Sequence, residues 1–137
     1  MLHVLPHTGG GGEVYVDLLA GIPETEQRRG YVSPGRSPVA AITALPVRGT
    51  AIRRAALASD LVHLHGDVAT ALALGFTARR PTVWTTHGLS FLRRSAGLPH
   101  ALFRRRLRAV IAHTRQTICT TDAERGELLA LVGAQLG

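Results

Sequence analysis

The sequence predicts an α/β fold in which a parallel sheet has helices on both faces, and three features lead to this prediction. Short apolar runs alternate with segments of helical spacing, and the connections between them are short. Two of these runs end in His-Gly and a third leads into a run of glycines, as expected for strand ends that open onto a binding site. A chain of 137 residues, 45% of them hydrophobic, can also form one domain with its own core, residues 1–137. The runs are Leu2–Pro6, Leu61–Gly66 and Thr82–Gly88.

The first half of the chain begins with a strand over Leu2–Pro6, which leads through a run of glycines into a predicted helix over Glu13–Ala20. Val14, Leu18 and Leu19 have helical spacing and predict the apolar face of that helix. The remaining elements of this half are a loop over Gly21–Gly30, a short strand at Tyr31–Ser33, a strand or helix over Val39–Val47 and a helix over Thr50–Ser59.

The second half contains clear helix start signals. Asp67 suits the N-cap of a helix that ends near Ala78, and Pro99 suits the first turn of a helix that ends near His113. Thr121 and Glu124 have the spacing of a capping box, in which each side chain accepts from the backbone N–H of the other. The predicted strands are His63–His65, the segment around Trp84 and Gln116–Thr120, and the last helix ends at Gly133.

Charge and composition restrict the partners. All 16 basic residues are arginines, and the net charge is +7. The densest cluster lies beside an apolar stripe with the spacing of an amphipathic helix, so its basic face is either solvated or placed against anionic lipid headgroups. Only 4% of the residues are aromatic and no nucleic-acid-binding motif is present, which argues against nucleic acid. The cluster is Arg104, Arg105, Arg106 and Arg108, and the stripe is Phe103, Leu107, Val110 and Ile111.

The chain has no export signal and no apolar stretch that approaches the roughly 18 residues needed to span a bilayer. A single cysteine, Cys119, excludes an intramolecular disulfide and a thiolate metal cage. We therefore expect a cytoplasmic protein, which the arginine cluster would allow to lie at the inner face of the membrane.

The glycine run Gly9–Gly12 predicts an anion site. A phosphate-binding P-loop needs a lysine, and the chain has none. The dinucleotide pattern also fails, because its third glycine position falls on Val14 or Tyr15. Glycines before a helix still leave backbone N–H groups accessible, so a diphosphate could approach the positive end of the helix. The alternative is a tight turn without a ligand.

The segment His63–Asp67 has the pattern H-x-H-x-D and suggests a rival hypothesis. Both histidines lie on the same face of a strand, and together with Asp67 they could begin the metal site of a hydrolase. Against this, the next position of the pattern should be histidine and is Val68. A core histidine is the better interpretation of His63, whereas His65, at the strand end, is a candidate for the cleft.

Four motifs follow one another along the chain: Gly10–Glu13, Asp60–Gly66, Thr85–Gly88 and Thr121–Arg125. Together they resemble the amino-terminal domain of family 4 glycosyltransferases. These enzymes have the GT-B fold, two facing Rossmann-like domains with the active site between them. The resemblance implies that Gly10, Gly11 and Glu13 line the cleft near the donor diphosphate and the acceptor, and that His87 contacts the transferred sugar. His65, Gly88 and Asp122 join them as candidate site residues.

The resemblance also implies a carboxyl-terminal domain that holds most of the nucleotide-sugar donor, and the sequence stops at Gly137 before any such domain. We therefore expect the acceptor-side half of a retaining glycosyltransferase, truncated and inactive alone, without a metal or other cofactor. The alternatives are a non-catalytic Rossmann-like binding or partner domain and the metal-dependent hydrolase that would use His63, His65 and Asp67.

Overall fold

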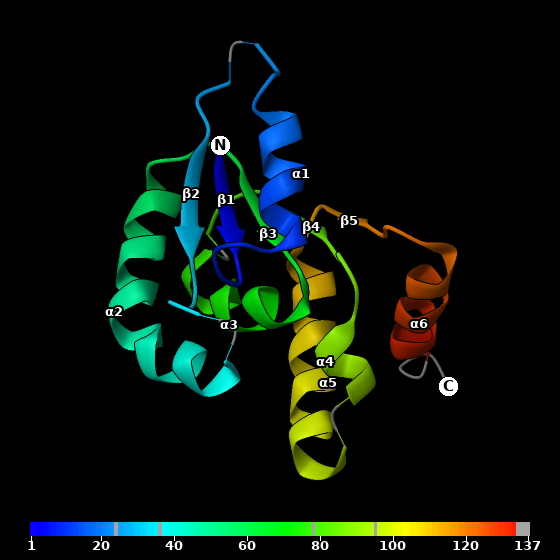
Figure 1. Ribbon diagram of the computed structural model, residues 1–137. Helices are drawn as coiled ribbons and strands as arrows, with labels where there is room; N and C mark the ends of the chain where they lie inside the picture. The colour runs from blue at the N-terminus through cyan, green and yellow to red at the C-terminus, as the bar shows by residue number, and fades with distance from the viewer. Residues whose placement is uncertain (24, 36, 78, 95, 134–137) are drawn as a thin grey trace.

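The computed structural model describes residues 1–23, 25–35, 37–77, 79–94 and 96–133 (Figure 1). Five parallel strands form one sheet in the order β2-β1-β3-β4-β5. The strands are β1 (Leu2–Leu5), β2 (Arg28–Tyr31), β3 (Val62–His65), β4 (Thr82–Thr85) and β5 (Gln116–Ile118). The helices are α1 (Gly11–Leu19), α2 (Pro38–Leu57), α3 (Asp67–Thr77), α4 (Ser90–Arg94), α5 (Gly97–His113) and α6 (Asp122–Gly133).

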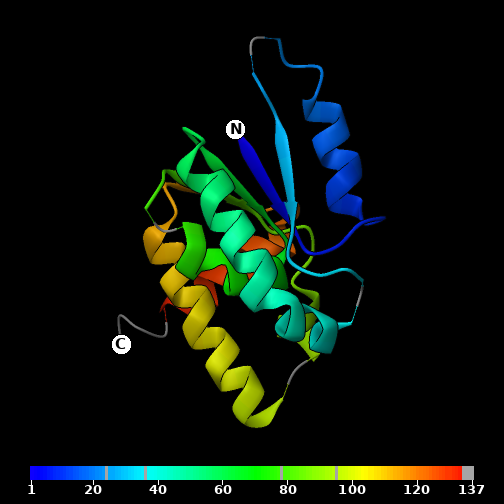
Figure 2. The same ribbon diagram turned by 90° about the vertical axis from the view of Figure 1, so that its left-hand side faces the viewer.

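Helices cover both faces of the sheet, so the predicted Rossmann-like α/β fold is confirmed. Helices α2, α3 and α5 pack together on one face, and α1 lies on the opposite face (Figure 2). The chain runs from β1 outward to β2 and then returns across β1 to β3. The strand order therefore reverses between β1 and β3, and ligands of such sheets bind at the carboxyl ends of the strands beside this point.

The central strands separate two kinds of side chain. In the register, Leu2 pairs with Val62 and Val4 with Leu64, and these aliphatic side chains belong to the main hydrophobic core. The residues between them alternate to the other face of the sheet. There His3 pairs with His63. The α1 face of the sheet therefore contains a layer of histidine side chains, beside the aliphatic side chain of Leu5.

Helix α1 approaches the sheet closely because of Gly12. A Cβ atom at this position would lie 2.9 Å from Cδ2 of Leu5 and 3.6 Å from Cβ of His65. A distance of 2.9 Å is shorter than van der Waals contact between carbon atoms. Glycine at this position therefore fixes how near the start of α1 lies to the ends of β1 and β3.

The predicted face of α1 is wrong, although the helix itself is confirmed. Val14 and Leu18 are 62% and 76% exposed, whereas Val16 is buried. Tyr15 turns toward the histidine layer and lies edge-on to the rings of His63 and His87. The apolar spacing on which the prediction rested therefore marks the solvent side of this helix.

Three further element predictions need correction. The second strand begins at Arg28, inside the predicted loop, because its backbone pairs with β1 through Leu5 and Tyr31. The two segments expected on either side of residue 48 form the single helix α2, which continues through Pro46 because Ala41 and Ile52, before and after the proline, are both buried in the core. Helix α4 was not predicted.

Candidate functional site

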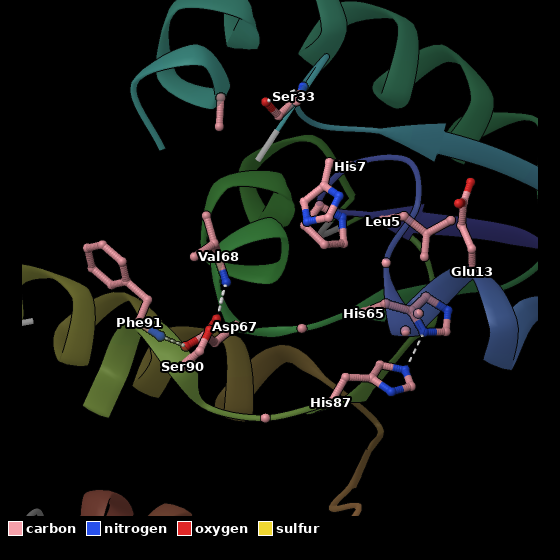
Figure 3. A pocket seen from close by; sticks show the side chains of 18 of the residues that line it. Leu5, His7, Glu13, Ser33, His65, Asp67, Val68, His87, Ser90 and Phe91 are labelled. Atoms are coloured by element: carbon pink, nitrogen blue, oxygen red, sulfur yellow. Dashed lines mark hydrogen bonds between the residues drawn. The ribbon is translucent and has the colours of Figure 1, made fainter. Parts of the chain in front are cut away.

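A cleft of about 460 Å³ lies at the carboxyl ends of β1, β3 and β4 (Figure 3). It adjoins the point where the strand order reverses, as expected for a ligand site in such a sheet. Six of the seven residues proposed from the sequence line it: Gly10, Gly11, Glu13, His65, His87 and Gly88. The seventh, Asp122, is exposed at the first turn of α6 and is not among the described residues that line the cleft.

The glycine loop presents the start of α1 to the cleft. Gly10 is the N-cap with extended backbone and makes no side-chain capping bond, and its carbonyl accepts from the backbone N–H of Glu13 at 3.0 Å. The first N–H groups of a helix have no partner within the helix and carry its partial positive charge. This part of the cleft is therefore suited to an anionic group.

Glu13 holds the glycine loop in place. Its carboxylate accepts from the N–H of Gly9 at 2.5 Å and from the hydroxyl of Tyr31 at 2.6 Å, so it joins the loop to the end of β2. These two hydrogen bonds, first that from Tyr31 and then that from Gly9, lower the pKa of Glu13. The carboxylate is therefore ionised at neutral pH, and it braces the glycine loop as well as lining the cleft.

The loop after β4 has an unusual backbone. His87 has a φ of 48° and Gly88 a φ of 89°, so two consecutive residues are in the left-handed region. Such a conformation costs a residue other than glycine about 1–3 kcal/mol, and it persists where the surroundings impose it. It turns the His87 side chain into the cleft, where Figure 3 shows it facing His65.

Glu124 of α6 braces this loop. Its carboxylate is 3% exposed and accepts from the hydroxyl of Thr86 and from the N–H and hydroxyl of Thr120, the last two at 3.0 and 2.7 Å. Burial raises the pKa of Glu124, but hydrogen bonds from Thr86, Thr120 and Gly88 outweigh it, so the net pKa is lowered. An ionised carboxylate thus ties α6 to the residues on both sides of His87.

One of the two hydrogen bonds of the predicted capping box is present. The Thr121 hydroxyl accepts from the N–H of Glu124 at 3.2 Å, as expected. The reciprocal bond was predicted from the N–H of Thr121, but it comes from Thr120, because the carboxylate also reaches across to Thr86. The spacing identified Glu124 as a cap and gave no indication that it supports the cleft.

Hydrogen bonds join the histidines into a chain that leads from the interior to the cleft. Nδ1 of His3 lies 3.0 Å from Nε2 of His65, and Nδ1 of His65 lies 2.9 Å from Nε2 of His87. His63 lies beside this chain and bonds through Nε2 to the Thr85 hydroxyl at 2.7 Å. His3 could not be included from the sequence, since only the parallel register brings it beside His63.

Burial keeps these imidazoles uncharged. It is the largest cause that lowers the pKa of His63 to about 4 and that of His65 to about 2, and nearby histidines add to the effect. Burial also lowers the pKa of His3 and of His87. At neutral pH each ring is therefore neutral, with one nitrogen that donates a hydrogen bond and one that accepts.

The contacts of Asp67 do not favour the rival hypothesis of a metal site. The Asp67 carboxylate accepts from the backbone N–H groups of Val68, Phe91 and Leu92 at 2.8, 2.9 and 3.1 Å, so it caps the starts of α3 and α4. Within the described residues, the set that could hold a metal ion consists of three buried histidines, with ligand atoms within 4.8 Å of one another. This set contains no carboxylate to balance a divalent charge in the interior. It comprises His3, His63 and His65.

The predicted arginine face is only partly exposed. Arg106 donates from Nε to the Ala71 carbonyl at 2.8 Å, and Arg108 donates to the Leu131 carbonyl at 2.9 Å, so both serve packing between helices. Arg105 is exposed and Arg104 is half-buried. In the described part of the chain, none of the helices has the length and apolar character needed to cross a membrane.

The fold and the cleft together define a Rossmann-like domain with a ligand site at the strand ends, lined by glycines at the start of a helix and by neutral imidazoles. The family model for Glycosyltransferase Family 4 matches residues 11–135. The chain therefore belongs to glycosyltransferase family 4, in agreement with the resemblance of its motifs. A comparison with curated proteins found no match.

The buried imidazoles predict acid-sensitive stability. Unfolding returns His63 and His65 to an ordinary pKa of 6.5, so below about pH 6.5 the unfolded chain binds protons that the folded chain excludes. The free energy of unfolding should fall as pH drops from about 6.5 toward 4, by up to about 1.4 kcal/mol per pH unit for each buried ring. Urea unfolding across this range measures the slope.

Two variants control for this pH dependence. His63→Gln should reduce the slope by about 1.4 kcal/mol per pH unit, whereas His113→Gln, at an exposed position, should leave it unchanged. Equal slopes for wild type and His63→Gln would contradict the interpretation that the buried ring is kept neutral.

Proposed function

We propose that this chain is the acceptor-side half of a retaining glycosyltransferase that moves a sugar from a nucleotide-sugar donor to an acceptor. Family membership supports the transferase class. The observation that supports the site most directly is that one cleft contains both the glycine loop at the start of α1 and the His87 loop after β4. The glycine loop can bind the diphosphate of a nucleotide sugar, and the His87 loop can bind its sugar. The bond that reacts joins these two groups.

In this proposal the donor diphosphate, or a phosphate of the acceptor, lies against the glycine loop. Gly11 has open space around it, since a Cβ atom there would meet nothing within 4 Å. Backbone N–H groups and the helix dipole favour an anion at such a position. Arg94, which also lines the cleft, adds a positive charge.

His87 contacts the transferred sugar in this proposal. The charge on the anomeric carbon grows in the transition state, and a neutral imidazole can support that change by hydrogen bonding without a competing positive charge. The left-handed backbone of His87, held through Thr86 and Glu124, keeps the ring at a defined position. A fixed position matters because catalysis by positioning depends on geometry to within about 1 Å.

We further propose that these 137 residues are inactive alone and require a donor-binding domain on the other side of the cleft. Positioning two reactants can contribute roughly 7–11 kcal/mol to lowering a barrier. Among the described residues that line the cleft, Arg94 is the one arginine, and it stands against the carboxylates of Glu13 and Asp67. A donor would therefore depend on contacts from a second domain.

Gly11→Val tests the glycine loop. The valine side chain should occupy the space of the anion and abolish binding of nucleotide diphosphate, while the thermal midpoint remains within a few degrees because the position is open. Gly126→Val, at an exposed position of α6 that is also open, is the matched control and should bind normally. Calorimetry with UDP and GDP, on the chain joined to a matching carboxyl-terminal domain, measures both. Normal binding by Gly11→Val would exclude the loop as the anion site.

A second prediction concerns turnover. Residues 1–137 alone should release no sugar from a panel of nucleotide sugars, and addition of the matching domain should restore transfer. In the restored enzyme His87→Ala should lower kcat by about 10–100-fold and change donor affinity less, because the proposed contact strengthens in the transition state. Turnover by the chain alone would refute the need for a second domain, and an unchanged kcat would remove His87 from the mechanism.

We also propose that α5 rests on an anionic membrane at the cytoplasmic face. Leu98 and Leu102 are 71% and 58% exposed on its first turns, and Arg105 is exposed one turn further. An apolar groove of about 350 Å³ runs beside them and shares Val68 and Phe91 with the cleft. A lipid chain in this groove would bring its headgroup close to the site of transfer.

Vesicle sedimentation tests the membrane proposal. Binding to phosphatidylglycerol vesicles should weaken as salt rises to about 0.5 M, where the Debye length falls below about 5 Å. Replacing both Arg104 and Arg105 by Gln should lower the partition coefficient by about 30-fold, at about 1 kcal/mol per arginine. The same change at Arg53 and Arg54, exposed on α2, removes equal charge and should have little effect. Sedimentation that neither salt nor the α5 variant alters would refute the proposal.

A further inference from the structure

The histidine chain ends in the interior at Gln27. The Gln27 amide nitrogen donates to the Leu19 carbonyl at 2.6 Å, and since a carbonyl can only accept, this bond fixes which end of the amide is oxygen. Among the described residues, the buried side-chain polar atoms without a hydrogen-bond partner are Oε1 of Gln27 and Nε2 of His3. Gln27 immediately precedes β2, whose register sets Arg29 beside His3, so the Gln27 side chain lies on the same face of the sheet as the His3 ring and next to it. Burial lowers the pKa of His3, and a side-chain interaction with Gln27 opposes that lowering.

These two atoms determine the direction of the chain. Oε1 of Gln27 is an acceptor, so the favourable state of His3 has its proton on Nε2, directed at that oxygen. The opposite tautomer would set two lone pairs against each other in a buried place, and a buried polar group without a partner costs about 1–3 kcal/mol. His3 therefore has a bare Nδ1.

The same argument applies in turn to His65 and to His87, toward the cleft. Because Nδ1 of His3 accepts, Nε2 of His65 must donate across their 3.0 Å contact. His65 is neutral, so its Nδ1 is bare and accepts in turn from Nε2 of His87 at 2.9 Å. His87 is neutral as well, which leaves its Nδ1 without a proton.

The structure assigns Gln27, His3 and His65 a positioning role, in which they hold His87 as the Nε2–H tautomer with Nδ1 free to accept a hydrogen bond. This inference rests on the proposed function, in which a sugar lies in the cleft that His87 lines. The free Nδ1 of His87 would accept a hydrogen bond from a hydroxyl of that sugar. A sugar that lacks this hydroxyl would leave Nδ1 unpaired and would be a poorer substrate. The selectivity of the cleft thus depends on an amide in the loop before β2.

Nitrogen-15 NMR of the histidine rings tests the assignment on the 137-residue chain without any substrate. Proton-bearing and bare ring nitrogens have distinct chemical shifts, so each tautomer can be identified at pH 7. His3, His65 and His87 should all be in the Nε2–H form. An Nδ1–H form or a charged ring at any of the three would overturn the inference.

A variant pair tests the role of the amide. Gln27→Leu removes the acceptor and should change the tautomer ratio of His87 by about tenfold toward the Nδ1–H form, the effect of about one hydrogen bond. Gln116→Leu, at an exposed position of β5, is the control and should leave the ratio unchanged. An unchanged ratio in Gln27→Leu would show that the amide does not set the direction. If Gln27→Leu does not fold, the tautomers measured in the wild-type chain test the inference without this variant.

Two further measurements separate the possible failures. Addition of Zn²⁺ should leave the ring signals unchanged, whereas shifts at His3, His63 and His65 would make the set a metal site and overturn the inference. In the restored enzyme, Gln27→Leu should reduce discrimination between a sugar and its deoxy analogue by about tenfold. Predicted tautomers together with normal turnover of His87→Ala would refute the proposed function and leave the tautomer assignment intact.

Discussion

The organisation of the cleft depends on the burial of imidazoles between the sheet and α1. His3, His63 and His65 are 0%, 5% and 0% exposed, and charged rings there would cost far more than neutral ones. They therefore remain neutral. His3 and His65 hydrogen-bond to each other and His63 bonds to the Thr85 hydroxyl, which fixes the orientation of the rings. His87 is the outermost member of this set, so a requirement of the interior determines how the ring in the cleft is placed.

Sequence patterns predicted the fold well because short strands, turns and caps are local signals. They could not predict the environment of each face. Val14 and Leu18 have helical spacing yet face solvent, because the sheet surface under α1 is polar and is covered through Tyr15 and Val16. Pro46 favours a helix break on its own, but burial on both sides of it keeps α2 continuous. In both cases tertiary packing outweighed the local preference.

Most of the site could be predicted because strand ends of a parallel sheet converge at one edge, which brings Gly11 and His87 into one cleft. What could not be predicted depends on contacts between distant segments. Glu124 has the spacing of a cap, and its bond to Thr86 becomes evident only in three dimensions. Arg106 has the spacing of a basic surface, but it is engaged by a carbonyl of α3. The position of His3 beside the other histidines becomes evident only from the strand register, which pairs it with His63.

Helix α1 buries little apolar surface, and this has a consequence for its motion. Val16 is the apolar side chain that this helix buries, and one valine contributes only about 1.5–3 kcal/mol, so α1 should detach locally well before the domain unfolds. Water would then reach the rings of His3 and His65, which would regain their ordinary affinity for protons. Mild acid would thus favour the open form of this one helix. The protection of the α1 amides against exchange should therefore fall as pH drops, measured relative to the intrinsic exchange rate, which itself slows in acid. The domain would loosen first at the glycine loop that lines the cleft.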